Sequence, residues 1–117
     1  MPKFEVDFYE TANGKKPAED FLMSLDQQMR SKMLSMITVL EENGNKLREP
    51  YSKFVSDGIY ELRGKVGSDI SRILYFFMVG QNIILTNGFI KKTHKIPRGE
   101  LKKAKKYRAD YLRRRTK

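Results

Sequence analysis

Two tight turns constrain how the second half of this chain can fold. Three stretches rich in β-branched and aromatic residues follow one another and are typical of strands, at residues 59–66, 70–79 and 82–92. The first turn has Gly67 at the first central position of a two-residue loop, as a type II′ hairpin prefers. This turn pairs Val66 with Asp69, and it therefore predicts that Arg63 lies directly opposite Arg72.

A second hairpin is predicted between the second and third of these stretches. A two-residue loop at residues 80–81 would place Phe89 opposite Arg72 and Lys91 opposite Ile70. A loop of four residues preserves this register, whereas a loop of three or five residues breaks it, because a shift by one residue turns every side chain to the other face.

The two registers also predict the composition of each face of the sheet, since successive strand side chains point to opposite faces. One face is expected to be charged at one end and apolar at the other. The charged end holds Glu61, Arg63, Lys65, Arg72, Phe89 and Lys91. The apolar end holds Leu74, Phe76, Met78 and Leu85. The opposite face is expected to be apolar and covered by helices, with Leu62, Ile73, Tyr75, Phe77, Ile84 and Ile90.

The predicted position of Arg63 opposite Arg72 conflicts with stable folding. Like charges directly opposite on a sheet cost roughly 0.2–1 kcal/mol relative to a neutral pair, and local conflicts of this kind tend to lie at functional sites. An anionic ligand would relieve the repulsion. The alternative interpretation is that Glu61, or another acidic residue, neutralises the pair.

The first half of the chain predicts one strand and two helices. Residues 3–9 alternate apolar and polar side chains, as a half-buried strand does. Pro17 suits the first turn of a helix. The next helix ends near Gly44 and carries an apolar stripe, formed by Met29, Met33, Met36, Ile37 and Leu40. We interpret this stripe as helix core, and a binding groove is the alternative.

The remaining segments complete an α+β prediction. Residues 48–57 have the pattern of a loop or a short strand, and a last helix is expected to begin near Pro97 and to run past Leu112. The resulting order is β-α-α-β-β-β-α, which predicts an antiparallel sheet with helices packed on one face. Residues 1–117 are expected to form one domain.

The net charge of +10 is concentrated near the C-terminus. Residues 1–88 contain 11 basic and 12 acidic residues, whereas residues 89–117 contain 13 basic and 2 acidic residues. A localised positive field attracts polyanions, most commonly nucleic acids. Lys102, Lys103 and Lys106 on the exposed side of the last helix are therefore candidates for RNA binding. A solubilising tail and an acidic protein partner are the alternatives.

Several classes of function lack support in the sequence. The chain has no cysteine, which excludes disulfides and thiolate zinc sites, and its single histidine without clustered carboxylates predicts no metal site. It has neither a P-loop nor a dinucleotide-binding fingerprint, so no cofactor is expected. The longest apolar run, residues 73–79, is far shorter than the ~20 residues of a membrane helix. Without a signal peptide, the prediction is a cytoplasmic protein that does not associate with membranes.

Metal-free cleavage of RNA is compatible with these residues. The ribose 2′-hydroxyl attacks its own phosphate, while the protein orients the nucleotide, stabilises the developing charge and transfers two protons. Arg63 and Arg72 suit charge stabilisation, because arginine stays protonated. Crowding by cations lowers the pKa of Lys91 or Lys92 toward that of a base. His94 is a further candidate for proton transfer, and a structural or merely exposed His94 is the alternative.

Three further residues are candidates for contacts with RNA. Lys65 lies at the charged end of the predicted sheet face, and Lys95 belongs to the basic run at residues 89–95. Phe89 is suited either to stacking on a base or to packing within the fold.

Three runs of sequence carry a family resemblance: GIYELR at 58–63, SRILYFF at 71–77 and NGFIKKTHKIP at 87–97. They strongly resemble the RelE/ParE toxin superfamily, and most of all its HigB or phage Gp49-like branch of type II toxin–antitoxin systems. The pattern G-F-x-K-K-T-x-K-x-P is the most specific part.

The resemblance implies a RelE-like microbial RNase fold, cleavage of mRNA in the A site of the 70S ribosome and a cognate HigA-like helix-turn-helix antitoxin. By position, Arg72 matches the strand arginine that contacts the scissile phosphate in RelE-like toxins. Lys91, Lys92 and Lys95 fall where those toxins place basic or aromatic site residues. Glu61 stands where some relatives carry a lysine, and the general acid and base stay unassigned.

Two other functions stay open at this point. A ParE-like poison of DNA gyrase would share the fold and need no catalytic arginine cluster. A non-catalytic nucleic-acid-binding module would bind polyanions with a steep salt dependence and leave RNA intact.

Overall fold

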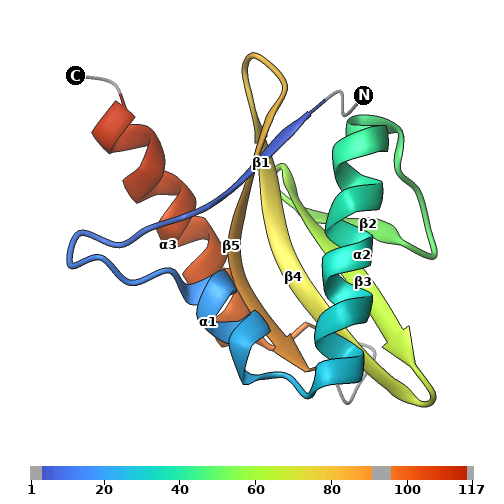
Figure 1. The fold of residues 1–117 in the computed structure, drawn as a ribbon. Coiled ribbons are helices and arrows are strands. Elements are labelled where there is room, and N and C mark those ends of the chain that lie inside the picture. Colours follow the sequence, from blue (N-terminus) through green and yellow to red (C-terminus); the bar gives the residue numbers. More distant parts are fainter. Residues whose placement is uncertain (1–3, 91–95, 116–117) are drawn as a thin grey trace.

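The computed structural model describes residues 4–90 and 96–115, and these form a twisted five-stranded sheet with three α-helices (Figure 1). The strands are β1 (Glu5–Phe8), β2 (Ser52–Ser56), β3 (Ile59–Val66), β4 (Asp69–Met78) and β5 (Asn82–Ile90). The helices are α1 (Pro17–Ser24), α2 (Gln27–Asn43) and α3 (Arg98–Arg115). The strands lie in the order β1-β5-β4-β3-β2, with β1 parallel to β5 and the other neighbours antiparallel. The predicted α+β class is confirmed.

Strand β2 adds an element to the predicted order. The observed order is β-α-α-β-β-β-β-α, with a short 3₁₀ turn, η1 (Gly44–Lys46), after α2. β2 lies at the edge of the sheet and pairs with β3 only from Ile59 to Leu62. Beyond Arg63, whose N–H still donates to the carbonyl of Tyr51, β3 has no strand partner on this edge within the described residues, and this edge borders the candidate site.

Local signals set the start of α1 and the end of α2 where the sequence predicts them, and a cap that was not predicted sets the start of α2. Pro17 occupies the first position of α1. The Asp26 carboxylate caps α2 by accepting a hydrogen bond of 2.9 Å from the backbone N–H of Met29, which satisfies one of the free N–H groups of the first turn. α2 ends at Gly44, whose φ of 53° favours glycine.

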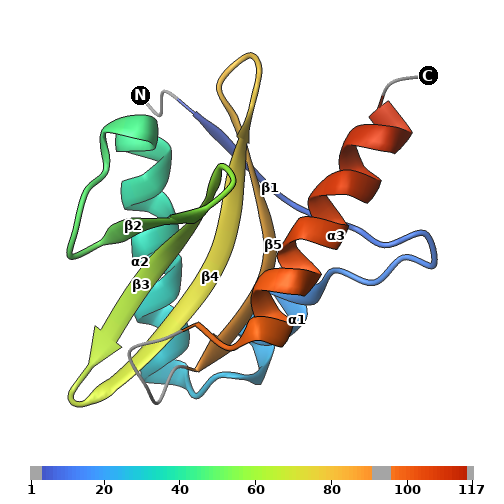
Figure 2. The same cartoon turned by 180° about the vertical axis from the view of Figure 1, so that it is seen from behind.

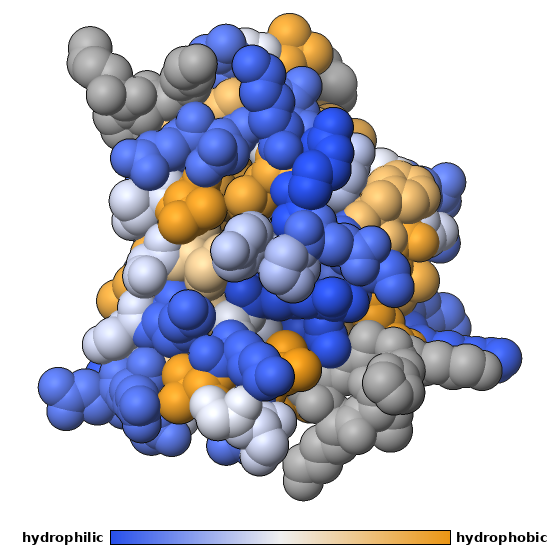
Figure 3. Space-filling model, turned by 90° about the vertical axis from the view of Figure 1, so that its right-hand side faces the viewer, coloured by the Kyte–Doolittle hydropathy of each residue, from blue (hydrophilic) through white to orange (hydrophobic). Residues whose placement is uncertain are grey.

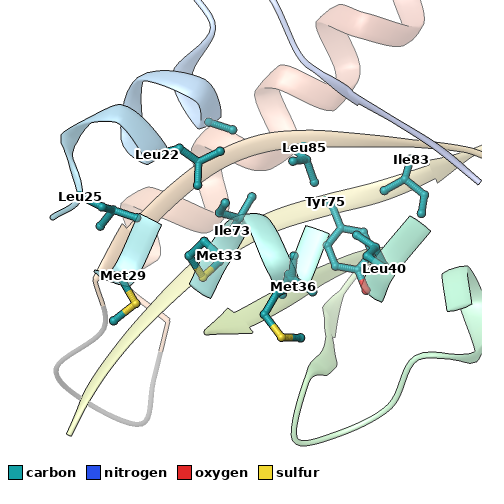
Figure 4. Packing of buried hydrophobic residues seen from close by; sticks show 12 residues of the cluster. Leu22, Leu25, Met29, Met33, Met36, Leu40, Ile73, Tyr75, Ile83 and Leu85 are labelled. Carbon is teal, nitrogen blue, oxygen red and sulfur yellow. The ribbon is translucent and has the colours of Figure 1, made fainter. Parts of the chain in front are cut away.

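Helices α1 and α2 cover one face of the sheet. The methionine stripe of α2 packs into the core between these helices and the sheet (Figure 4). This confirms the interpretation of the stripe as helix core. The buried residues of the core are Ala18, Leu22 and Leu25, then Met29, Met33, Met36 and Leu40 from α2, and Leu62, Ile73, Tyr75, Ile83 and Leu85 from the sheet.

The basic helix α3 lies on the opposite face of the sheet (Figure 2). The prediction that the helices share one face is therefore wrong. The apolar residues under α3 are Ile59, Leu74, Phe76, Ile84 and Phe89. The physical reason is that the central strands β4 and β5 are apolar on both sides, so each side needs a cover that excludes water.

Polar contacts hold α3 to the sheet near both of its ends. At the start, the Asn87 side-chain amide donates to the backbone carbonyl and to Oε1 of Glu100, at 3.1 and 3.0 Å. Toward the end, the Tyr9 hydroxyl donates to Asp110 at 2.6 Å, and the Tyr9 ring stacks on Tyr107. Burial and then the Asp110 carboxylate raise the pKa of Tyr9 to about 12, so this hydroxyl stays a donor at neutral pH.

The β3–β4 hairpin has the predicted register. Val66 pairs with Asp69 across the turn, and Gly67 has a φ of 61°, as the first central residue of a type II′ turn requires. Arg63 lies directly opposite Arg72. The prediction on which the candidate site depends is therefore confirmed.

The β4–β5 hairpin keeps the predicted register only at the end that carries Arg72. Phe89 lies opposite Arg72, as predicted. The connection comprises three residues, 79–81, instead of two, and Thr86 forms a bulge that compensates for the odd loop. The Thr86 hydroxyl donates to the backbone carbonyl of Leu74 at 3.1 Å and so closes the bulge.

Because of the bulge, two residues of β5 face opposite to the prediction. Ile84 packs with Phe76 beneath α3, whereas Leu85 lies in the core under α1 and α2. The predicted faces of Ile84 and Leu85 are therefore wrong, since the extra residue reverses the side to which the β5 residues between the hairpin tip and the bulge point. The predicted pairing of Ile70 with Lys91 involves Lys91, which lies outside the described residues.

Gly88 lies where α1 packs closely against β5. A Cβ atom at this position would lie 2.2 Å from the ring of Phe21. We expect Gly88→Ala to lower the free energy of unfolding by about 1–3 kcal/mol, because the ring must move within a packed core. Urea denaturation of wild type and variant measures this difference.

Gly99→Ala is the matched control, because a Cβ atom there meets nothing within 4 Å. It lies in the first turn of α3, where alanine favours the helix by up to about 1 kcal/mol. Its stability should be unchanged or slightly higher. Identical denaturation curves for wild type and Gly88→Ala would contradict the close approach of α1 and β5.

Candidate nucleic-acid interface

A buried carboxylate joins the two arginines that face each other on β3 and β4. Arg72 Nη1 donates to Oε2 of Glu61 at 2.7 Å, and Arg63 Nε lies 3.5 Å from the same oxygen. Arg63 Nη1 also lies 3.9 Å from a carboxylate oxygen of Glu49. The alternative that Glu61 neutralises the facing arginines therefore matches the observed contacts.

Glu61 and Arg72 are almost completely withdrawn from water, with 1% and 5% of their surfaces exposed. Burial lowers the pKa of Arg72, and the attraction and hydrogen bond of Glu61 oppose that shift. The guanidinium stays charged, because the ordinary pKa of arginine lies above ~12. The buried part of the site thus sets the one carboxylate of Glu61 against two guanidinium groups and carries excess positive charge, because the second carboxylate near Arg63, that of Glu49, is 65% exposed and 3.9 Å away.

Two hydrogen-bond donors of this cluster are unsatisfied within the described residues. The Nε atoms of Arg63 and Arg72 are buried and have no hydrogen-bond partner there. A buried donor without a partner costs about 1–3 kcal/mol. An anion that accepts from these N–H groups would remove that cost and balance the extra charge.

A cavity of about 400 Å³ opens beside the arginines, at the edge of β3 beyond its pairing with β2. Among the described residues, the lining of the cavity contains no acidic side chain and five cationic ones, from Lys32, Lys53, Arg63, Lys65 and Arg72. Figure 3 shows hydrophilic side chains gathered across this side of the molecule, with hydrophobic ones between them. The volume lies in the range of small-ligand sites, and the lining charge selects for an anionic group.

Phe89 lies opposite Arg72 but does not present its ring to a ligand. Only 8% of its surface is exposed, and it packs with Leu74 and Ala104 beneath α3. Of the two roles considered for Phe89, the observed position matches packing. Lys65, by contrast, is exposed and lies at the cavity.

The lysines of α3 form a separate group of exposed cations. Lys102, Lys103 and Lys106 are exposed, and Lys103 lies 3.7 Å from Glu100 within the same helix. α3 packs on the sheet face that also carries Arg72, since Leu74 points to the same side of β4. The predicted site residues Lys91, Lys92, His94 and Lys95 lie outside the described residues.

Several cavity residues, among them Lys32, Tyr51 and Lys53, were not predicted as site residues from the sequence. Lys53 pairs with Glu61 across β2 and β3, and the carbonyl of Tyr51 accepts a hydrogen bond of 2.9 Å from the N–H of Arg63. The available signal was Asp-Gly at residues 57–58, where both φ angles are positive, as in a type I′ hairpin turn. That turn on its own would place Lys53 opposite Leu62, and the bulge between Phe54 and Ser56 shifts Lys53 opposite Glu61, so the turn signal alone was not sufficient.

The described part of the chain shows neither a cluster of metal-binding side chains nor a helix that could cross a membrane. No group of three or more histidine, cysteine, aspartate or glutamate residues there is arranged to hold a metal ion. No described helix combines the length and the apolar character that crossing a membrane requires.

The family model described as "Phage derived protein Gp49-like (DUF891)" matches residues 20–109, which run from α1 into α3 and include the arginine pair and the cavity. No curated protein matches the chain significantly. The element order and the mostly antiparallel sheet are consistent with a RelE-like fold.

Glu61→Gln tests the buried ion pair. We expect it to lower the free energy of unfolding by about 3–5 kcal/mol, because Arg72 becomes a buried charge without its partner. Inorganic phosphate should restore part of this loss, since it can accept from the freed guanidinium. Denaturation in phosphate and chloride buffers of equal ionic strength measures both effects.

Glu49→Gln is the control for this experiment. Its carboxylate lies 3.9 Å from Arg63 and its side chain is 65% exposed, so the change should stay within about 1 kcal/mol. If Glu61→Gln were as stable as wild type in chloride, the assignment of Glu61 as the counter-charge of Arg72 would be wrong.

Proposed function

Because this chain belongs to the phage-derived Gp49-like protein family, we propose that it is the toxin of a type II toxin–antitoxin system and that it cleaves mRNA on the ribosome. Family membership supports the role as a toxin. The observation that supports RNA as the ligand is the cavity whose charged lining residues are all cationic, beside an arginine with a buried free N–H.

In the proposed reaction the 2′-hydroxyl oxygen of a nucleotide attacks the adjoining phosphorus, and the bond from phosphorus to the 5′ oxygen breaks. The products are a 2′,3′-cyclic phosphate and a 5′-hydroxyl. Negative charge grows on the non-bridging oxygens during the attack, and the guanidinium groups of Arg63 and Arg72 stabilise it. Glu61 holds the Arg72 guanidinium in a fixed orientation, so little rearrangement is needed in the transition state.

The reaction also requires two proton transfers, for which we propose a group of residues instead of one named acid and one named base. Lys91, Lys92 and His94 are our candidates from the sequence for general acid and base. A ribosome that presents mRNA in a fixed conformation reduces what the protein itself must supply, because positioning alone removes much of the barrier. This is why we propose a ribosome-dependent reaction that needs no metal.

The proposed setting is the bacterial cytoplasm, with a HigA-like helix-turn-helix antitoxin as partner. The cationic groups that bind mRNA and ribosome also form a surface that an antitoxin with acidic side chains can neutralise. The proposed RNA contacts include Lys65 at the cavity and the three exposed lysines of α3.

Arg72→Ala should reduce cleavage at least about 100-fold, as the loss of one charge-stabilising donor does in other enzymes. Arg72→Lys should also be impaired, because lysine keeps the charge and lacks the planar fork and the Nε–H group. The measurement is translation of a defined mRNA in a purified system, with 5′ ends mapped by primer extension and a ribosome-free reaction alongside.

Lys46→Gln is the control, since Lys46 is exposed in η1 on the α2 side of the sheet. Circular dichroism of each variant separates loss of catalysis from loss of folding. Undiminished cleavage by Arg72→Ala would exclude Arg72 from the site. Intact mRNA with the wild-type protein would exclude the endonuclease, and DNA supercoiling by gyrase would then be the next assay.

The exposed lysines of α3 should control affinity more than chemistry. Replacing Lys102, Lys103 and Lys106 by glutamine should weaken binding to ribosomes and reduce the slope of log affinity against log salt by about 0.7 for each phosphate that the variant no longer neutralises. Lys105 is left in place, because it lies 3.6 Å from Asp57. An unchanged slope would show that this face of α3 is only solvated.

A further inference from the structure

The exposed ring of Tyr51 sets this residue apart from the other aromatic residue of the β2 segment. Tyr51 and Phe54 are both about half exposed, at 51% and 55%. The Phe54 ring packs edge-on against Tyr60, at 5.4 Å between centroids, whereas Tyr51 makes no such ring contact within the described residues. Tyr51 lines the cationic cavity and Phe54 does not.

The backbone of Tyr51 is nevertheless fixed. Its carbonyl accepts the 2.9 Å hydrogen bond from the N–H of Arg63, and β2 begins at the next residue, Ser52. When Tyr51 binds a ligand, it therefore loses only the conformational entropy of its side chain, and this loss is small for a tyrosine. A free ring on a fixed backbone beside an arginine is suited to stacking.

The cavity combines the two kinds of surface that a nucleotide presents. Arg63 and Arg72 lie at one side and have positive charge and free Nε–H groups for a phosphate. Met36, Ile70 and the Tyr51 ring give apolar surface for a base. A base stacks on aromatic rings through its π face, whereas a peptide that carries only carboxylates would leave the apolar surface unused.

The edge of β3 adds two polar groups to the same place. The N–H of Arg63 points toward β2, so the alternation of an antiparallel strand directs the N–H and carbonyl of Lys65 to the same edge. Within the described residues, no strand pairs with this edge of β3 beyond Leu62, and the last backbone hydrogen bond across it joins Arg63 to Tyr51. One donor and one acceptor of the main chain are thus presented to the edge of a base.

We propose that this cavity is a binding subsite for one nucleotide of single-stranded RNA, in which the base stacks on Tyr51 and the adjoining phosphate lies against Arg63 and Arg72. The inference rests on the proposed function for its choice of RNA as ligand. The proposed subsite adds a contact between one base of the substrate and Tyr51, which lies outside the arginine pair.

Fluorescence anisotropy with a labelled hexanucleotide tests this subsite. The RNA carries 2′-O-methyl groups, so that it cannot be cleaved. Tyr51→Leu should weaken binding at least about fivefold, which is the lower end of the loss when one base is deprived of its stacking partner. Tyr51→Phe should bind within about twofold of wild type, because it keeps the ring. Phe54→Leu is the matched control and should also stay within about twofold.

Additional measurements distinguish the nucleotide subsite from a folding defect and from an acidic protein partner. Urea denaturation of each variant shows that the exposed substitutions leave the fold intact. Equal affinities of Tyr51→Leu and Phe54→Leu would overturn the subsite, as would an absence of RNA binding by the wild type. An oligoglutamate peptide that binds as tightly as the RNA, with the same dependence on Tyr51, would overturn it in favour of an acidic protein partner.

The cleavage assay keeps this inference separate from the proposed function. If Tyr51→Leu retains wild-type RNA affinity while the wild type still cuts mRNA on ribosomes, the subsite fails and the endonuclease stands. If Tyr51→Leu loses affinity while the wild type leaves mRNA intact, the subsite stands and the endonuclease fails.

Discussion

The buried ion pair between Glu61 and Arg72 is the interaction on which the arrangement of the site depends. Two charges withdrawn from water lose several kcal/mol of hydration each, and only close geometry recovers it. The 2.7 Å contact requires β3 and β4 to keep a single register, because a slip by one residue would send Arg72 into the core under α1 and α2. The type II′ turn at Gly67 supplies that register.

The turn-based part of the fold was predictable because it is local. Glycine at the first central position of a two-residue loop determines both the turn type and the pairs beyond it, so Arg63 opposite Arg72 followed from the sequence. The bulge at Thr86 was not predictable in this way, since it depends on how β5 meets β4 across the sheet. The face covered by α3 was also missed, because strands that are apolar on both sides do not show which helix covers which side.

In the candidate site too, features set by local sequence were predictable and features set by tertiary packing were not. The arginine pair and Lys65 came from strand alternation, and the role of Glu61 as counter-charge was an alternative that the contacts now match. Phe89 was expected in the right place, but the sequence could not decide between stacking and packing, which depends on the position of α3. Tyr51 and Lys53 were missed because their segment pairs with β3 over only a few residues, too few for alternation to stand out.

The Thr86 bulge also separates two parts of one hairpin. Between the bulge and residues 79–81 the β4–β5 register differs by one residue from that at Arg72, and the hydroxyl of Thr86 marks the boundary. A change in length at the tip can be absorbed at such a boundary before it reaches the arginines. The tip of this hairpin could therefore be lengthened or shortened without moving Arg72 relative to Arg63 at its other end.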